Sequence, residues 1–196
     1  MATEDLRVRK TKLTIQKGFA ECISKKTFSK LTIQDLTQAM MINKSTFYKY
    51  YQDKYDLRDT MVQETLKSFV QYLNISFLNP SKSDTLAHYR NRLIKILLPI
   101  FHHKDWLNVL WSTNLELDVF NEMQTKLAQK FKTHILTNDH HDEKFNNLQA
   151  NLYSASIMQI LKWWFYESPT SSVENIADII IKCLKNSTNI NLKETN

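Results

Sequence analysis

Residues 32–57 of the chain read TIQDLTQAMMINKSTFYKYYQDKYDL. This stretch contains two short helical patterns, a tight turn between them and the start of a further helix. Thr32 with Asp35 three residues later predicts a capping box, and Asn43 predicts the cap of the second helix. Positions 47–51 hold four aromatic residues, more than a solvated helix needs, so some are expected to pack inward. The stretch therefore predicts two short helices that present a basic, hydroxyl-rich surface.

A short basic helix braced by another helix is the form that a reader of the DNA major groove takes. Lys44, Ser45 and Thr46 are predicted to lie at or near base edges, where a lysine can bind guanine. Phenol, hydroxyl and ammonium groups around them are suited to phosphates. The residues predicted to contact DNA are Thr32, Asn43, Lys44, Ser45, Thr46, Tyr48, Lys49 and Lys54.

The same residues resemble the amino-terminal domain of the TetR/AcrR family of bacterial regulators. The resemblance covers Ile33–Leu36, the run KSTFYKYY at residues 44–51 and DKYDL at residues 53–57. It spans two helices, the turn and the start of the next helix, about the first third of the chain. Met41 stands where the family usually has a turn glycine, and Thr27 where its first helix usually ends in glycine. Because glycine tolerates positive φ, the turn is expected to be strained or slightly altered.

The composition predicts an all-α fold. The 196 residues include one glycine and three prolines, too few turn formers for an all-β chain. A helix-turn-helix domain is predicted over residues 1–52, a helical effector-binding and dimerisation domain over 53–187, and a polar tail over 188–196. Gly18 falls inside the first predicted helix, at about residues 5–24, where it indicates a close approach of two helices.

The charge distribution favours a nucleic-acid-binding head on a nearly neutral body. Residues 1–60 hold twelve Lys/Arg against seven Asp/Glu, and the remaining residues hold fourteen against thirteen. The chain begins with a charged segment, no apolar run approaches a membrane span, and its two cysteines are far apart, so a cytoplasmic protein with free thiols is expected.

The later helices are predicted from periodicity. The fourth helix is expected to run on to about residue 77, and others to cover about residues 84–101, 106–111, 116–136, 145–166 and 173–185. Ser171 with Glu174 predicts a second capping box. The last two helices are apolar around much of their girth, which favours burial against a second subunit. The candidate interface residues are Leu161, Trp164, Ile176, Ile180 and Leu184.

The resemblance implies a homodimer in which the last two helices form a four-helix interface, and a body that binds a small effector. Aromatic and apolar residues could line such a pocket, although filling the core is the simpler role for any one of them. The candidates are Phe69, Tyr72, Tyr89, Leu93, Trp106, Trp111, Phe120 and Tyr153. The run at residues 153–169 also resembles a subgroup of the family, found in low-GC Gram-positive bacteria, that includes dihydroxyacetone-kinase regulators. In that subgroup a co-regulator protein can matter as much as a ligand.

No catalytic constellation stands out, so the chain is not expected to be an enzyme, and no cofactor is predicted. The six histidines lack a metal-binding spacing; the best arrangement is His140-His141-Asp142-Glu143, and no metal site is predicted. The predicted function is a homodimeric repressor, released from a pseudo-palindromic DNA operator by a small-molecule effector. The alternative is a helical co-regulator that acts through protein contacts and binds no small molecule.

Overall fold

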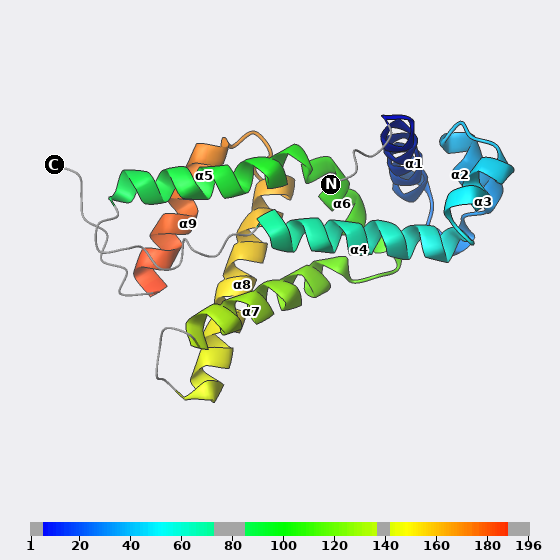
Figure 1. The fold of residues 1–196 in the computed structure, drawn as a ribbon. Helices are drawn as coiled ribbons and strands as arrows, with labels where there is room; N and C mark the ends of the chain where they lie inside the picture. The colour runs from blue at the N-terminus through cyan, green and yellow to red at the C-terminus, as the bar shows by residue number, and fades with distance from the viewer. Residues whose placement is uncertain (1–5, 73–84, 137–141, 188–196) are drawn as a thin grey trace. The chain divides into compact units, whose positions relative to one another are not determined.

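The structure is a computed structural model, and it describes residues 6–72, 85–136 and 142–187. Every regular element in these ranges is helical (Figure 1), which confirms the all-α prediction. The elements are α1 (Leu6–Lys25), the 3-10 helix η1 (Phe28–Lys30), α2 (Ile33–Ala39), α3 (Lys44–Tyr50), α4 (Lys54–Tyr72), α5 (Leu86–His102), α6 (Lys104–Leu110), the 3-10 helix η3 (Thr113–Leu115), α7 (Val119–Leu136), α8 (Glu143–Tyr166) and α9 (Val173–Ser187).

The chain divides into two compact units. The first, here called the head, comprises Met1–Leu66 and Asp105–Val119. The second, here called the body, comprises Lys67–Lys104 and Phe120–Asn196. The head is therefore built from two separate parts of the chain, whereas the sequence predicted one continuous domain at residues 1–52.

The short helices of the head begin where the sequence predicts. Thr32 Oγ1 accepts a hydrogen bond from the Asp35 amide, and the Thr32 amide donates to Asp35 Oδ2, which confirms the capping box. The side chain of Asn43 accepts from the Thr46 amide at 2.8 Å and caps α3. Asp53 Oδ1 accepts from the Asp56 amide at 2.8 Å at the start of α4. These caps pair amide groups that a helix start leaves without an internal partner.

The close approach predicted at Gly18 is confirmed. A Cβ atom at this position would lie 2.6 Å from Met40 Cγ and 2.7 Å from the Met40 amide nitrogen. Glycine is therefore required for α1 to pack directly on the end of α2. The core around this contact includes Ile15, Phe19 and Leu36, each 0% exposed.

Met41 and Thr27, the two departures from the family glycines, have different outcomes. Met41 adopts a φ of 52°, in the left-handed region that glycine favours, and its side chain is 90% exposed. The strain expected in this turn is thus present. Thr27 adopts a φ of −62° and an extended backbone, so no glycine is needed at the end of α1.

In the body, α9 packs on α5 and also contacts α8. The ring of Trp164 stacks on Phe101 with centroids 5.0 Å apart, and Trp164 Nε1 donates to the carbonyl of Ser171 at 2.9 Å. Arg90 on α5 binds both carboxylate oxygens of Asp178 on α9, at 2.6 and 3.0 Å. A stacked core and a two-point ion pair therefore hold these helices together.

Some predicted boundaries were wrong. The cap of α9 is Ser172, whose Oγ accepts from the Asn175 amide, and not Ser171. Helix α7 begins at Val119 instead of residue 116, because Glu116 has a φ of 59° and interrupts the helical backbone. Helix α8 begins at Glu143, after its cap Asp142. The predicted end of the fourth helix near residue 77 and the polar tail at 188–196 lie outside the described residues.

Candidate nucleic-acid interface

Helix α3 presents an outward polar face on the head. Phe47 is 0% exposed and holds the helix on the core, in edge contact with the ring of Tyr48 at 5.5 Å. Lys44, Tyr48 and Lys49 are exposed on its other sides. Two ammonium groups and a phenol thus lie on the solvent side of one short helix, the arrangement that phosphate and base-edge contacts require.

The side chains of Thr32, Asn43 and Ser45, also in the predicted DNA-contact set, take part in local hydrogen bonds. Asn43 Oδ1 accepts from both the Thr46 amide and Ser45 Oγ, each at 2.8 Å. The Thr32 hydroxyl donates to Asp35 Oδ2 at 2.8 Å, so its proton is already bonded. Thr32 and Asn43 therefore shape the two helices, and Ser45 and Thr46 lie beside the cap of α3.

Lys54 does not fit the predicted role of a phosphate ligand. Its Nζ donates to the carbonyl oxygens of Phe28, Ser29 and Leu31, at 3.1, 2.9 and 2.9 Å. An ammonium group has three N–H donors, and all three bind the connection between α1 and α2. The sequence could not indicate this, because the acceptors are main-chain atoms more than twenty residues away.

Asp35 is the most strongly perturbed carboxyl group near this surface. Hydrogen bonds from the Thr32 amide, the Lys26 ammonium and the Thr32 hydroxyl lower the pKa of Asp35 to about 2. Tyr51, at the end of α3, is 7% exposed, and burial raises its pKa to about 12, with a smaller contribution from Glu64. The carboxylate of the cap therefore stays charged and the phenol of Tyr51 stays neutral at physiological pH.

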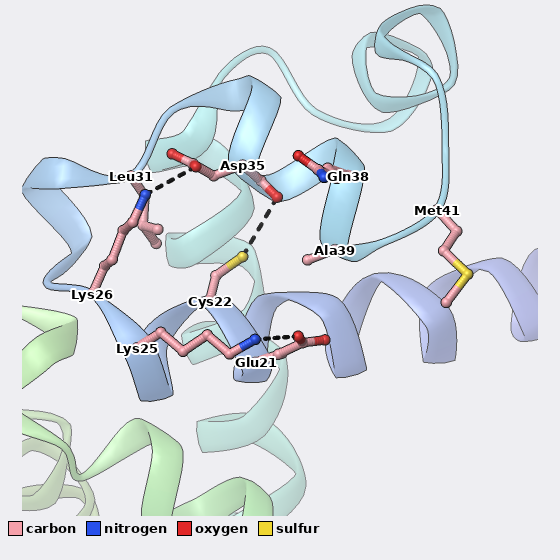
Figure 2. Close-up of a pocket in the computed structure, with 9 residues that line it drawn as sticks. All are labelled: Glu21, Cys22, Lys25, Lys26, Leu31, Asp35, Gln38, Ala39 and Met41. Carbon is pink, nitrogen blue, oxygen red and sulfur yellow. Dashed lines mark hydrogen bonds and ion pairs between the residues drawn. The ribbon is translucent and has the colours of Figure 1, made fainter.

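A hollow of about 350 Å³ lies between α1 and α2 (Figure 2). Ion pairs of Lys25 with Glu21 at 2.5 Å and of Lys26 with Asp35 at 3.0 Å border it. Cys22 lies in its floor and donates to the Asp35 carbonyl at 3.7 Å, and burial raises the pKa of this thiol. The thiol is therefore a protonated structural group and a poor nucleophile. The complete lining is Glu21, Cys22, Lys25, Lys26, Leu31, Asp35, Gln38, Ala39 and Met41.

None of the eight residues predicted to line an effector pocket borders this hollow. Trp106 and Trp111 belong to the head, and the other six belong to the body. Four of those six are core residues with 1–8% exposure, Tyr72 is 42% exposed and Phe120 is half-buried. The four core residues are Phe69, Tyr89, Leu93 and Tyr153.

The candidate interface residues of the last two helices are buried within the chain itself. Leu161, Trp164 and Ile176 are 0% exposed and Ile180 is 2% exposed, so their side chains face the body's own core. The side chain of Leu184 lies outside the described part of the structure. Helix α8 instead exposes Phe145, Leu148 and Leu152, at 51%, 56% and 57%. None of these three residues is among the interface candidates that the sequence predicted.

In the described ranges, no three His, Cys, Asp or Glu side chains gather as a metal ion would require; His140 and His141 lie outside these ranges. Over the same residues, no helix has both the length and the apolar character that a membrane crossing demands.

The chain is similar to known transcriptional regulators in sequence and in fold. No family model matches the chain. It is 28% identical over 181 residues to the uncharacterized HTH-type transcriptional regulator YxbF of Bacillus subtilis (strain 168). The match covers 88% of this chain and 44% of the relative, so the chain spans less than half the length of that relative.

The fold is similar to solved regulator structures. The dihydroxyacetone kinase operon activator DhaS has a TM-score of 0.53 at 15% identity, with 93% of this chain and 98% of DhaS covered. The TetR family repressor AlkX from Dietzia sp. strain DQ12-45-1b has a TM-score of 0.48 at 12% identity, with 88% and 97% covered, a likeness too low to add to the argument.

The two capped short helices α2 and α3 have the helix-turn-helix arrangement, and the chain is similar in sequence to an HTH-type transcriptional regulator. The solved structure of DhaS shares this fold.

Proposed function

We propose that the chain binds a pseudo-palindromic DNA operator as a homodimer and thereby regulates transcription. The observation that carries this proposal is the outward face of α3, where Lys44, Tyr48 and Lys49 are exposed around one buried anchor, Phe47. Two copies of α3 would enter successive major grooves about 34–36 Å apart. The proposed base-edge contacts are Lys44, Ser45 and Thr46, and Tyr48 and Lys49 would bind phosphates.

The exposed apolar face of α8 supports the dimer. Phe145, Leu148 and Leu152 recur at steps of three and four residues, so they share one side of the helix, and all three are more than half exposed. Three large apolar side chains in a row are costly to leave in water and are typical of an interaction surface. A second copy of α8 would cover them.

The direction of regulation and its trigger belong to the same proposal. We expect a cytoplasmic repressor that leaves its operator when a small-molecule effector binds the body. A transcription assay with the selected operator upstream of a reporter tests the direction, because a repressor lowers the signal when the protein is added.

The main experiment is selection of bound duplexes from a random DNA pool, followed by affinity measurements at several salt concentrations. Tyr48→Ala and Lys49→Ala should weaken binding to all duplexes, and Lys49→Ala should reduce the slope of log K against log salt by about one. Lys182→Ala, which removes an exposed lysine of the body, is the matched control and should change neither quantity. If the wild-type protein selects no sequence and binds no duplex at low salt, the proposal fails.

A further inference from the structure

We infer that Lys54 and Glu116 are positioning residues for DNA binding, which hold the connection between α1 and α2 from two sides. Both act on Ser29, in the 3-10 helix η1 that precedes α2. The inference rests on the proposed function and deepens it, because it makes residues 105–119 part of the DNA-binding unit.

Lys54 holds the carbonyl side of the connection. Its ammonium group binds three main-chain acceptors, the carbonyls of Phe28, Ser29 and Leu31. It also lies 5.0 Å from the ring centroid of Phe28, and the guanidinium of Arg58 lies 4.5 Å from the same centroid. Two cations against one buried ring fix the connection to the first turns of α4.

Glu116 holds the other side. Its Oε2 accepts from the Ser29 amide at 2.9 Å, and its Oε1 accepts from Ser29 Oγ at 2.7 Å. Hydrogen bonds to a carboxylate are stronger than neutral ones. Glu116 reaches Ser29 from a backbone with a φ of 59°, an uncommon conformation for a residue other than glycine. An uncommon backbone conformation that aims a carboxylate at one loop indicates a specific role.

Further bonds attach the same segment to the head. Asn114 Nδ2 donates to the Ile23 carbonyl, near the end of α1, at 2.9 Å. Trp106 Nε1 donates to Thr65 Oγ1 on α4 at 2.8 Å, and its ring lies 6.3 Å from that of Phe19. Residues 105–119 thus bind α1, η1 and α4 through side chains, in agreement with their place in the compact head.

The position of Ser29 affects the position of α3 through the closely packed helix α2. Ser29 lies three positions before Thr32, which caps α2, and the far end of α2 packs on Gly18 without space for a Cβ atom. A shift of the connection therefore moves α2, and α3 with it, because close-packed elements transmit displacement. Releasing Lys54 or Glu116 should misplace α3 in the groove while the number of phosphate contacts stays the same.

The test measures affinity and salt dependence for Glu116→Ala, Glu116→Gln and Lys54→Met, using a duplex selected by the wild-type protein and one of random sequence. Glu116→Ala and Lys54→Met should weaken binding to the selected duplex about ten- to a hundredfold. Binding to the random duplex and the salt slope should change little. Glu116→Gln keeps an acceptor for Ser29 and should stay within about threefold of wild type. Circular dichroism must show every variant folded at the assay temperature.

Two outcomes would overturn the inference. A salt slope that falls by about one in Lys54→Met, as for Lys49→Ala, would make Lys54 a phosphate ligand. Wild-type specificity in Glu116→Ala would show that the carboxylate has no positioning role. If the wild-type protein itself binds no duplex, the proposed function fails instead, so the two failures are distinguishable.

Discussion

Helices α3 and α8 each leave a face exposed, and the two faces have opposite chemistry. Helix α3 buries Phe47 and exposes ammonium, hydroxyl and phenol groups. Helix α8 buries one side along its whole length and exposes Phe145, Leu148 and Leu152 near its beginning. A polar face is stable in water and can await a charged ligand, whereas an exposed apolar row gains free energy only when another surface covers it. The proposed function assigns a nucleic-acid partner to α3 and a second copy of the chain to α8.

The largest expected effect tests how α3 is anchored. Phe47→Ala removes a ring that is 0% exposed and should lower the free energy of unfolding of the head by about 3–5 kcal/mol. Tyr48→Ala, on the neighbouring and 55% exposed position, should change it by less than about 0.5 kcal/mol. Denaturant unfolding followed by circular dichroism measures both. If both variants lowered the free energy of unfolding equally, Phe47 would not be the residue that anchors α3 to the core.

The next effect tests the exposed face of α8. Leu152→Glu should raise the dimer dissociation constant about a hundredfold, because it places a charge in an apolar contact. Gln159→Glu, at an exposed polar position of the same helix, is the matched control. Analytical ultracentrifugation over a concentration series gives both constants. A Leu152→Glu protein that dimerises like wild type would exclude this face as the interface.

The packing of α1 on α2 gives a smaller but definite effect. Gly18→Ala should destabilise the head by about 1–3 kcal/mol, because its Cβ would lie 2.6–2.8 Å from Met40 atoms that include the backbone. Thermal unfolding checks the sign. A stabilised variant would contradict the close approach, since alanine is otherwise the better helix former.

Met41 should respond in the opposite direction. Met41→Gly removes the cost of a φ of 52° and should stabilise the head by about 0.5 kcal/mol after the greater entropy of the unfolded glycine is subtracted. Met41→Ala keeps the backbone strain and should give no gain, so it separates backbone from side chain. Thermal unfolding of the three proteins decides; a gain in Met41→Ala alone would assign the effect to the side chain.

The smallest effect depends on pH. The pKa of Asp35 falls from 3.8 to about 2 on folding, so its stabilising contribution is complete above pH 4 and is lost as the pH falls through 2. The difference in melting temperature between wild type and Asp35→Asn should therefore shrink between pH 4 and pH 2. A difference that stays constant over this range would show that the Asp35 charge does not stabilise the cap.

In the head, the local sequence predicted the helix caps but not the contacts between distant residues. The caps at Thr32, Asn43 and Asp53 were predictable because a cap depends on residues three or four positions apart. The role of Lys54 was not, because its acceptors are carbonyls of a connection that is distant in sequence. Glu116 was missed for the same reason: Ser29, its partner, lies 87 residues away.

In the body, periodicity predicted that α8 has more than one apolar side. It could not show which of these sides is buried by other residues of the same chain. Trp164 and Ile180 were chosen for an interface, yet both are buried in the body's own core. Phe145 is equally apolar and remains exposed.

The sequence by itself determined the helical class, the motif of the head and the local starts of its short helices, because these depend on neighbouring residues and on the spacing of apolar side chains. Only the tertiary structure decided which residues complete the head, which cations bind main-chain carbonyls and which apolar face stays uncovered. These properties depend on contacts between distant parts of the chain, and such contacts leave no local pattern in the sequence.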